Sequence, residues 1–227
     1  MKTRSLEPEI LDERRPTRPE LESTVRFLSW INRKLGGVRA MRRAFAAIPW
    51  SGTLRVLDVA TGDADVPRAL VEWARAAGRK IEFVAFDRES DMLDLAREQS
   101  RGYPEIAFAQ GDARSMPFDP GSFDFVTSTL FFHHLPDDAV VSALQSFARI
   151  AKRGIVVNDL LRRRRLYFWT KFFTWFGNDI VRYDGPLSVR KSFTLPEIEA
   201  LVAKAGLPWL KARVVFGHRF VLCGEKP

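Results

Sequence analysis

The chain has 227 residues, 46% of them hydrophobic, and a formal net charge of +8, which suits one globular domain with a small appendage and excludes a disordered chain. The single cysteine, Cys223, excludes an intramolecular disulfide and a zinc site made of cysteines. The N-terminus lacks the apolar segment of a secretory signal, and no apolar run approaches the roughly 20 residues of a membrane span, so we expect a cytoplasmic protein.

The first 50 residues predict an arm followed by helices. Residues 1–20 are polar and contain several prolines, and we expect a flexible arm there. Over 21–50 the apolar residues recur at helical spacing, and Gly36-Gly37 separates a long helix from a shorter one. We therefore expect an N-terminal helical cover over 21–50.

From residue 54 onward, apolar strands alternate with helices, which is typical of an α/β fold with a parallel sheet. The predicted strands are 54–60, 80–87, 106–112, 123–132 and 153–159, and the predicted helices are 67–77, 90–99, 137–151 and 195–206. The last two predicted strands, 210–217 and 218–225, are joined by so short a turn that they can only be antiparallel. Residues 51–227 thus predict a Rossmann-like, doubly wound seven-stranded sheet, mostly parallel, with an antiparallel C-terminal hairpin.

An aromatic and basic insertion, 160–194, follows the fifth predicted strand. Open α/β sheets bind ligands at the carboxyl ends of their strands, so we interpret the insertion as a helical cover over the substrate. Three alternatives remain: a face that lies on a membrane with Arg162–Arg165 toward anionic headgroups, a nucleic-acid surface with stacking aromatic rings, or a helix packed on the N-terminal helices. The expected substrate contacts are Trp169, Phe173, Tyr183 and Arg190.

The turn after the first predicted strand is acidic. It reads "VLDVATGDADVPRAL" and contains Asp58, Asp63 and Asp65, but it lacks the G-x-G-x-x-G fingerprint of dinucleotide sites. A pyrophosphate would be repelled by these carboxylates. A ligand with a sulfonium and an α-ammonium group suits the turn better, and S-adenosylmethionine has both, so we expect it as the cofactor.

Acidic residues also end the next two strands. "VAFD" places Asp87 where a carboxylate can bind both hydroxyls of a ribose, and "QGDA" places Asp112 where it can accept a hydrogen bond from an adenine amino group. "TSTLFFHHLPD" ends the fourth strand and is expected to face the donated methyl group.

Residues 54–160 resemble the class I S-adenosylmethionine-dependent methyltransferases, in the small-molecule branch that includes the ubiquinone and menaquinone methylases. The matching stretches are "VLDVATGDAD", "VAFDRESDMLDLAR", "GDARSMPFDPGSFDFVTSTLFFHHLPD" and "FTLPEIEALVAKAGL". The family loop usually reads like "VLDVGCGTG", so Ala60 replaces a glycine here; we expect ordinary backbone angles at this alanine and a functional loop. The resemblance implies a cofactor site formed by Asp58, Ala60, Gly62, Asp63, Asp87, Arg88, Met92, Gly111, Asp112, Ala113 and Thr129.

His133 and His134 follow the fourth strand. Two histidines can bind a metal, but the third histidine of the chain is distant and no cluster surrounds the pair, so we expect no metal. One ring instead suits a general base that takes a phenol or enol proton during methyl transfer, and we favour His133. Asp159, at the end of the fifth strand, is expected to orient the imidazole or to cap the next helix.

These features together predict a methyltransferase for a small, aromatic, hydrophobic acceptor: a phenol, a quinone or a polyketide, with O-methylation favoured over C-methylation. The alternatives are an RNA methyltransferase and a non-catalytic S-adenosylmethionine-binding protein. "STLF" stands where an Asn-Pro-Pro-Tyr-like tetrad would indicate methylation of a base amine, so we expect no nucleic-acid partner. We expect a monomer or a homodimer, with peripheral membrane contact as one outcome.

Overall fold

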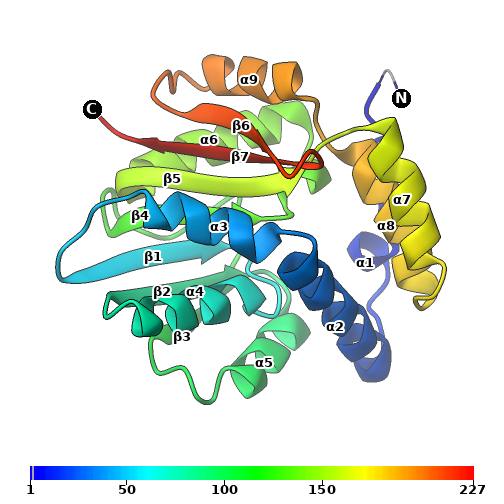
Figure 1. The fold of residues 1–227 in the computed structure, drawn as a ribbon, viewed down its shortest axis with the longest axis horizontal. Helices are drawn as coiled ribbons and strands as arrows, with labels where there is room; N and C mark the ends of the chain where they lie inside the picture. The colour runs from blue at the N-terminus through cyan, green and yellow to red at the C-terminus, as the bar shows by residue number, and fades with distance from the viewer. Residues whose placement is uncertain (2) are drawn as a thin grey trace.

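The computed structural model describes residues 1 and 3–227 and has one seven-stranded sheet in the order β3-β2-β1-β4-β5-β7-β6 (Figure 1). The strands are β1 (Thr53–Val59), β2 (Lys80–Asp87), β3 (Ile106–Gln110), β4 (Phe123–Thr129), β5 (Ala151–Leu160), β6 (Lys211–Val215) and β7 (Arg219–Glu225). The helices are α1 (Ile10–Glu13), α2 (Arg18–Lys34), α3 (Gly37–Ala46), α4 (Asp65–Ala76), α5 (Ser90–Gln99), α6 (Asp137–Ile150), α7 (Arg164–Thr174), α8 (Asp179–Lys191) and α9 (Leu195–Lys204), with one 3₁₀ turn, η1 (Phe132–His134).

Strand pairing confirms the predicted fold class. Strands β1 to β5 pair in parallel, and β7 runs antiparallel to both β5 and β6. The order reverses between β1 and β4, which is the topological switch point where doubly wound sheets bind their ligands. The carboxyl ends of β1, β2, β4 and β5 therefore define the region in which the site is built.

Each face of the sheet has its own apolar core. Helices α6 and α9 cover one face, where Phe147 and Ile198 are fully buried with Leu222 of β7. Helices α3 and α4 cover the other face with Phe45 and Leu70. Because both faces are covered, the central strands are apolar almost throughout, and this is why the sequence predicts them as continuous hydrophobic runs.

The fourth strand is shorter than expected. It ends at Thr129, and Leu130 then adopts a left-handed backbone with φ 56°, so the chain turns into the 3₁₀ segment η1. "FFHH" is therefore a tight turn rather than an extended strand. This turn holds His133 and His134 at the edge of the sheet instead of along it.

The N-terminal residues expected to form a flexible arm pack against the body of the protein. The half-buried Arg4 donates to the backbone oxygens of Lys191, Leu135 and His133, and its guanidinium lies 3.7 Å from the ring centroid of Phe193. In α1, the Ile10 and Leu11 amides donate to the Asp184 carboxylate of α8. These contacts tie η1 to α8, and the hydrophobic pattern gives no sign of them because they are polar.

The insertion forms two helices, α7 and α8, that pack against each other at the end of the sheet toward which β1 points, next to α1 and α2 (Figure 1). Gly185 permits this close packing, since a Cβ atom there would lie 2.5 Å from Thr174 Cγ2. The insertion thus stands beside the carboxyl ends of the strands, where a substrate cover is expected.

Candidate active site

The loop between β1 and α4 is held by hydrogen bonds within the protein. Asp58 is buried and accepts from the hydroxyls of Thr61 and Thr127, each at 2.7 Å. Ala60 has φ 55° and Ala64 has φ 59°, so both adopt the left-handed conformation that favours glycine. The expectation of ordinary angles at Ala60 was wrong: this alanine keeps the backbone shape of the glycine it replaces, at a cost in strain.

The carboxylates of this loop differ in their partners. Asp63 accepts from Arg68 at 3.0 Å and from the Ser29 hydroxyl at 2.9 Å, so its carboxylate is committed to holding α4 and α2 together. Asp58 and Asp65 have no cationic side chain bonded to them among the described residues. Burial raises the pKa of Asp58 to about 6, and burial with the nearby charge of Asp63 raises the pKa of Asp65 to about 7.

Asp87 sits at the carboxyl end of β2, beside the loop after β1. Its carboxylate accepts from the Gly62 amide at 2.9 Å and from the Glu89 amide at 3.1 Å, while burial raises its pKa. The Gly111 amide donates to the Asp87 carbonyl, and a Cβ atom at Gly111 would lie 2.6 Å from the Phe86 ring. The expected ribose ligand and the glycine loop are therefore joined, and the chain at 111 approaches β2 as only glycine allows.

The residues expected around the adenine follow β2 and β3, and their side chains contact other protein groups. Asp112 pairs with Arg114 at 2.5 Å, and that hydrogen-bonded partner lowers its pKa to about 2. Arg88 pairs with Glu89 at 2.8 Å. Met92 packs against buried residues of α2 and α5, and Ala113 packs against the core beneath α6.

His133 and Asp159 form a buried pair. The imidazole Nδ1 lies 2.7 Å from Asp159 Oδ1, and the His133 amide donates to Asp159 Oδ2 at 3.1 Å. Although burial raises the pKa of Asp159, the His133 partner outweighs it and the net shift is downward. An ionised Asp159 accepts the Nδ1–H, which leaves the His133 Nε2 lone pair free to accept a proton.

His134 has different partners. Its Nδ1 lies 3.2 Å from both carboxylate oxygens of Asp12 in α1, and its ring lies 4.3 Å from the ring of His133. Burial lowers the pKa of His134, but the Asp12 hydrogen bond and the charge of Glu9 outweigh burial and raise it. The raised pKa favours the protonated form of His134, which cannot accept a further proton, so we expect the two rings to have separate roles.

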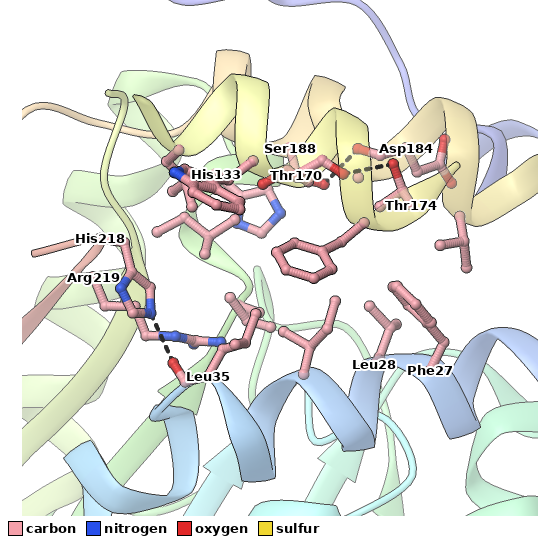
Figure 2. Close-up of a pocket in the computed structure, with 18 of the residues that line it drawn as sticks. Phe27, Leu28, Leu35, His133, Thr170, Thr174, Asp184, Ser188, His218 and Arg219 are labelled. Atoms are coloured by element: carbon pink, nitrogen blue, oxygen red, sulfur yellow. Dashed lines mark hydrogen bonds between the residues drawn. The ribbon is translucent and has the colours of Figure 1, made fainter. Parts of the chain in front are cut away.

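A cavity of about 540 Å³ lies between α2 on one side and α7 and α8 on the other, with His133 and Arg219 at its inner end (Figure 2). Its walls are mostly apolar: α2 contributes Phe27, Leu28, Ile31 and Leu35, and the insertion contributes Leu166, Trp169, Phe173, Ile180 and Val181. Trp169 and Phe173 stack with ring centroids 5.7 Å apart and are 58% and 37% exposed, so they form the rim.

Two of the expected substrate contacts are not at this cavity. Tyr183 and Arg190 lie on the outer side of α8, where Arg190 pairs with Glu7. The inner side of α8 carries Asp184 and Ser188, one helical turn apart. The sequence pattern did not show the rotation of this helix, because its faces differ little in hydrophobicity.

The structure adds residues that sequence reasoning missed. Glu9 is 3% exposed and its carboxylate lies 3.9 Å from His133 Nε2 and 3.8 Å from His134 Nε2. These three residues bring ligand atoms within 4.8 Å of one another, which is close enough for a metal ion. However, the Lys191 ammonium lies 3.4 Å from Glu9 and supplies a positive charge there, so we retain the prediction that no metal binds.

Comparison with known proteins identifies the central part of the chain. A family model described as a methyltransferase domain matches residues 56–154. This part of the chain is similar to a methyltransferase domain. The curated relatives and solved structures that this chain resembles are methyltransferases, and S-adenosylmethionine is the cofactor named for two of the solved structures.

Two curated relatives are demethylmenaquinone methyltransferases. That of Staphylococcus epidermidis is 35% identical over 103 residues, which cover 45% of this chain and 41% of the relative. That of Bacillus licheniformis is 28% identical over 165 residues, or 66% of this chain and 69% of the relative. The match to the staphylococcal relative thus spans about two fifths of its length.

Solved structures share the fold of the methyltransferase domain and its helices. A methyltransferase of Aquifex aeolicus has a TM-score of 0.64 at 16% identity and covers 93% of this chain and 99% of its own. Human N-acetylserotonin methyltransferase, solved with S-adenosylmethionine, has a TM-score of 0.68 at 15% identity and covers 92% of this chain and 56% of its own. Among the residues that the structure describes, no helix is both long and apolar enough to cross a membrane.

The residues present fit this cofactor. A cationic ligand would stabilise the ionised forms of Asp58 and Asp65, two buried carboxylates with raised pKa values, and S-adenosylmethionine carries a sulfonium and an ammonium group. Asp87 retains lone pairs for ribose hydroxyls beyond its two backbone donors. The approach of Gly111 to Phe86 leaves the chain after β3 close against β2, beside Asp87.

Proposed function

We propose that this protein transfers a methyl group from S-adenosylmethionine to an oxygen of a small aromatic acceptor held in the cavity between α2 and α7–α8. The observation that carries the proposal is the buried His133–Asp159 pair at the inner end of an apolar cavity. His133 follows β4, Asp159 lies near the carboxyl end of β5, and β4 lies beside β1 in the sheet, so the base and the loop after β1 share one edge.

When bound, S-adenosylmethionine supplies an electrophilic methyl group on its sulfonium. The chain's part is to hold the acceptor in line with that methyl group, and positioning of this kind contributes most of the rate of such displacements. As the O–CH₃ bond forms and the C–S bond breaks, the acceptor oxygen loses its proton to His133 Nε2. Asp159 keeps the Nδ1–H in place and stabilises the imidazolium that results.

The apolar walls favour an aromatic acceptor. Rings of Trp169 and Phe173 at the rim and of Phe27 inside offer surfaces against which a flat ring packs. The quinone-type acceptors named for the curated relatives belong to this class, and a phenol or a hydroxyquinone is the acceptor we propose. O-methylation is favoured because a general base is needed for a hydroxyl.

We propose that α7 acts as a lid over this cavity. Six aromatic residues in and just after this helix are strongly exposed: Phe168, Trp169, Phe172, Phe173, Trp175 and Phe176. Exposed aromatic patches of this size mark binding sites, and a peripheral membrane contact is the alternative outcome. Asp12 and Glu9 lie beside the histidines.

The direct test is methyl transfer by the purified full chain. Tritium from labelled S-adenosylmethionine is measured on a panel of phenols and hydroxyquinones, and in parallel on total RNA. Transfer to a phenol or hydroxyquinone supports the proposal. Transfer to RNA alone, or cofactor binding with no transfer to any acceptor, contradicts it.

A further inference from the structure

Arg219 is the first residue of β7 and is fully buried at the inner end of the cavity (Figure 2). One terminal nitrogen of its guanidinium donates to Asn32 Oδ1 at 3.2 Å. Within the described chain, its Nε and its other terminal nitrogen have no hydrogen-bond partner. Buried arginines are almost always paired, so an unpartnered guanidinium facing a cavity indicates a ligand.

The carboxylates nearest to Arg219 are committed elsewhere. Asp159 bonds to His133, and Asp65 bonds to the Asn32 amide. Both raise the pKa of Arg219 by their charge, but burial has the larger effect and lowers it to about 10. The guanidinium therefore stays positive at neutral pH, and its charge is only partly balanced by the protein.

The other buried charged groups that line the cavity already have partners. Glu9 lies 3.4 Å from the Lys191 ammonium, and Asp184 accepts from two α1 amides. Both ring nitrogens of His218 lie 2.7 Å from carbonyl oxygens, those of Phe216 and Leu35. Among the described residues, Arg219 is thus the buried charged group of this lining whose N–H groups remain available.

The position of Arg219 is fixed by the start of α3. A Cβ atom at Gly37 would lie 3.1 Å from an Arg219 terminal nitrogen and 2.7 Å from Asn32 Oδ1. The backbone at Gly37 therefore packs against the guanidinium and limits its movement. A side chain held in this way is preorganised for a ligand.

Two more unpartnered polar side chains lie on the same face of the sheet. Thr129 of β4 pairs in register with Asn158 of β5, which pairs with Val221, two residues along β7 from Arg219. Residues paired in register share a face, and alternate residues of a strand lie on the same face, so Thr129, Asn158 and Arg219 lie on one face of the sheet. The Thr129 hydroxyl and both polar atoms of the Asn158 amide have no partner within the described chain. Among the described residues, unpartnered polar atoms thus accompany Arg219 on this face of the sheet.

We propose that Arg219 binds an anionic oxygen of the methyl acceptor, so that the acceptor is an organic acid with an apolar aromatic body. The anion is a carboxylate or an ionised enol or phenol group, and the apolar part fills the space between α2 and α7–α8. Arg163 and Arg165 at the exposed rim add positive charge that attracts such an acceptor. The substrate class rests on the proposed methyl transfer, whereas the anion site itself is tested by binding alone.

The test compares two ligands that differ in one carboxylate, 1-hydroxy-2-naphthoate and 1-naphthol, by calorimetry with the full chain and S-adenosylhomocysteine. We expect the naphthoate to bind at least about tenfold more tightly, the size of a charge-assisted hydrogen bond. Arg219→Met should lose this preference, and Arg219→Lys should retain part of it. The control is Arg213→Met on β6, which removes the same charge from an exposed position and should behave as wild type.

Stability and cofactor affinity distinguish an anion site from a purely structural role of Arg219. Since the guanidinium is buried and poorly partnered, Arg219→Met should unfold at the same temperature as wild type or higher. A much lower unfolding temperature would show a structural role and overturn the proposal. The proposal would also be overturned if the wild type bound the two naphthalenes equally or did not bind the naphthoate. It would be overturned as well if Arg219→Met lost affinity for S-adenosylhomocysteine but kept its preference for the naphthoate. A wild type that prefers the naphthoate through Arg219 but methylates no acceptor would refute the proposed function and leave the anion site standing.

Discussion

The cofactor loops and the acceptor cavity are built in opposite ways. The loops after β1, β2 and β3 are formed by residues close in sequence to the strands that carry them, and their polar atoms bond to one another, as Asp87 does to Gly62. The cavity is assembled from α1, α2, the insertion and β7, which are far apart in the chain. Its inner end keeps polar atoms without partners among the described residues. Local motifs thus form the proposed cofactor site, while long-range packing forms the proposed acceptor cavity.

This difference accounts for which features the sequence could predict. The strand order, the antiparallel hairpin and the positions of Asp58, Asp87 and Asp112 follow from hydrophobic runs that end in acidic turns. Glu9 could not be found in this way, because it reaches the histidine site from the other end of the chain, and Arg219 meets α2 across a similar separation. Their contacts are polar and join residues far apart in the chain, so the hydrophobic periodicity of the sequence does not predict them. The rotation of α8, which places Tyr183 outside the cavity, is hidden for a related reason.

The largest expected effect is on His133, the proposed base, which lies between the cofactor loops and the acceptor cavity. His133→Ala should lower kcat by about 10²–10⁴-fold, the usual loss for a general base. S-adenosylmethionine affinity should be unchanged, since the ring lines the acceptor cavity. The measurement is steady-state methyl transfer beside calorimetry of the cofactor.

His134→Ala is the matched control, because the two rings are adjacent but His134 pairs with Asp12. It should lower the unfolding temperature and keep most of kcat. A reversed pattern would move the base to His134, and full activity in both variants would mean that the acceptor arrives already ionised.

The cofactor side is tested by Asp87→Ala. It should weaken S-adenosylmethionine binding by about 1–3 kcal/mol, because ribose hydroxyls and the Gly62 amide lose their acceptor. Asp91→Ala, which removes an exposed carboxylate of α5 that pairs with Arg15, is the control and should bind normally. Unchanged affinity in a folded Asp87→Ala protein would remove the ribose role.

The acceptor side is tested at the rim. Trp169→Ala combined with Phe173→Ala should raise the acceptor KM by about tenfold, from the loss of buried aromatic surface, and leave the cofactor affinity unchanged. Phe168→Ala with Phe172→Ala removes two exposed rings of the same helix and serves as the control. If the rim variant keeps its kinetics and loses binding to anionic liposomes, α7 is a membrane contact rather than a lid.

The electrostatics of the cofactor loop predict a dependence on pH. Asp58, with a pKa of about 6, and Asp65, with a pKa of about 7, attract the cationic cofactor only when ionised. S-adenosylmethionine should therefore bind about tenfold more weakly at roughly pH 5.5 than at roughly pH 8. S-adenosylhomocysteine, which lacks the sulfonium charge, is the control ligand and should depend less on pH.

The raised pKa values of Asp58 and Asp65 also determine how the stability of the protein changes with pH. The folded protein holds the Asp58 and Asp65 protons more tightly than the unfolded chain does, so their contribution to stability is lost as pH rises through 6 and 7. Thermal unfolding without cofactor should show this decline. A cofactor affinity that is the same at both pH values would mean that these carboxylates do not face the positive groups of S-adenosylmethionine.

The smallest effect probes the strain that the cofactor loop retains. Ala60 occupies a left-handed conformation with φ 55°, which costs an L-residue roughly 1–2 kcal/mol, while glycine adopts it freely. Part of that gain is offset by the greater freedom of glycine in the unfolded chain, so Ala60→Gly should raise the free energy of unfolding by about 0.5–1 kcal/mol. Ala200→Gly, at an exposed position inside α9, should instead lower it by about 0.5–1 kcal/mol. Denaturant unfolding of both variants measures the contrast, and a loss of stability in Ala60→Gly equal to that of the helix control would show that the loop is not strained at this alanine.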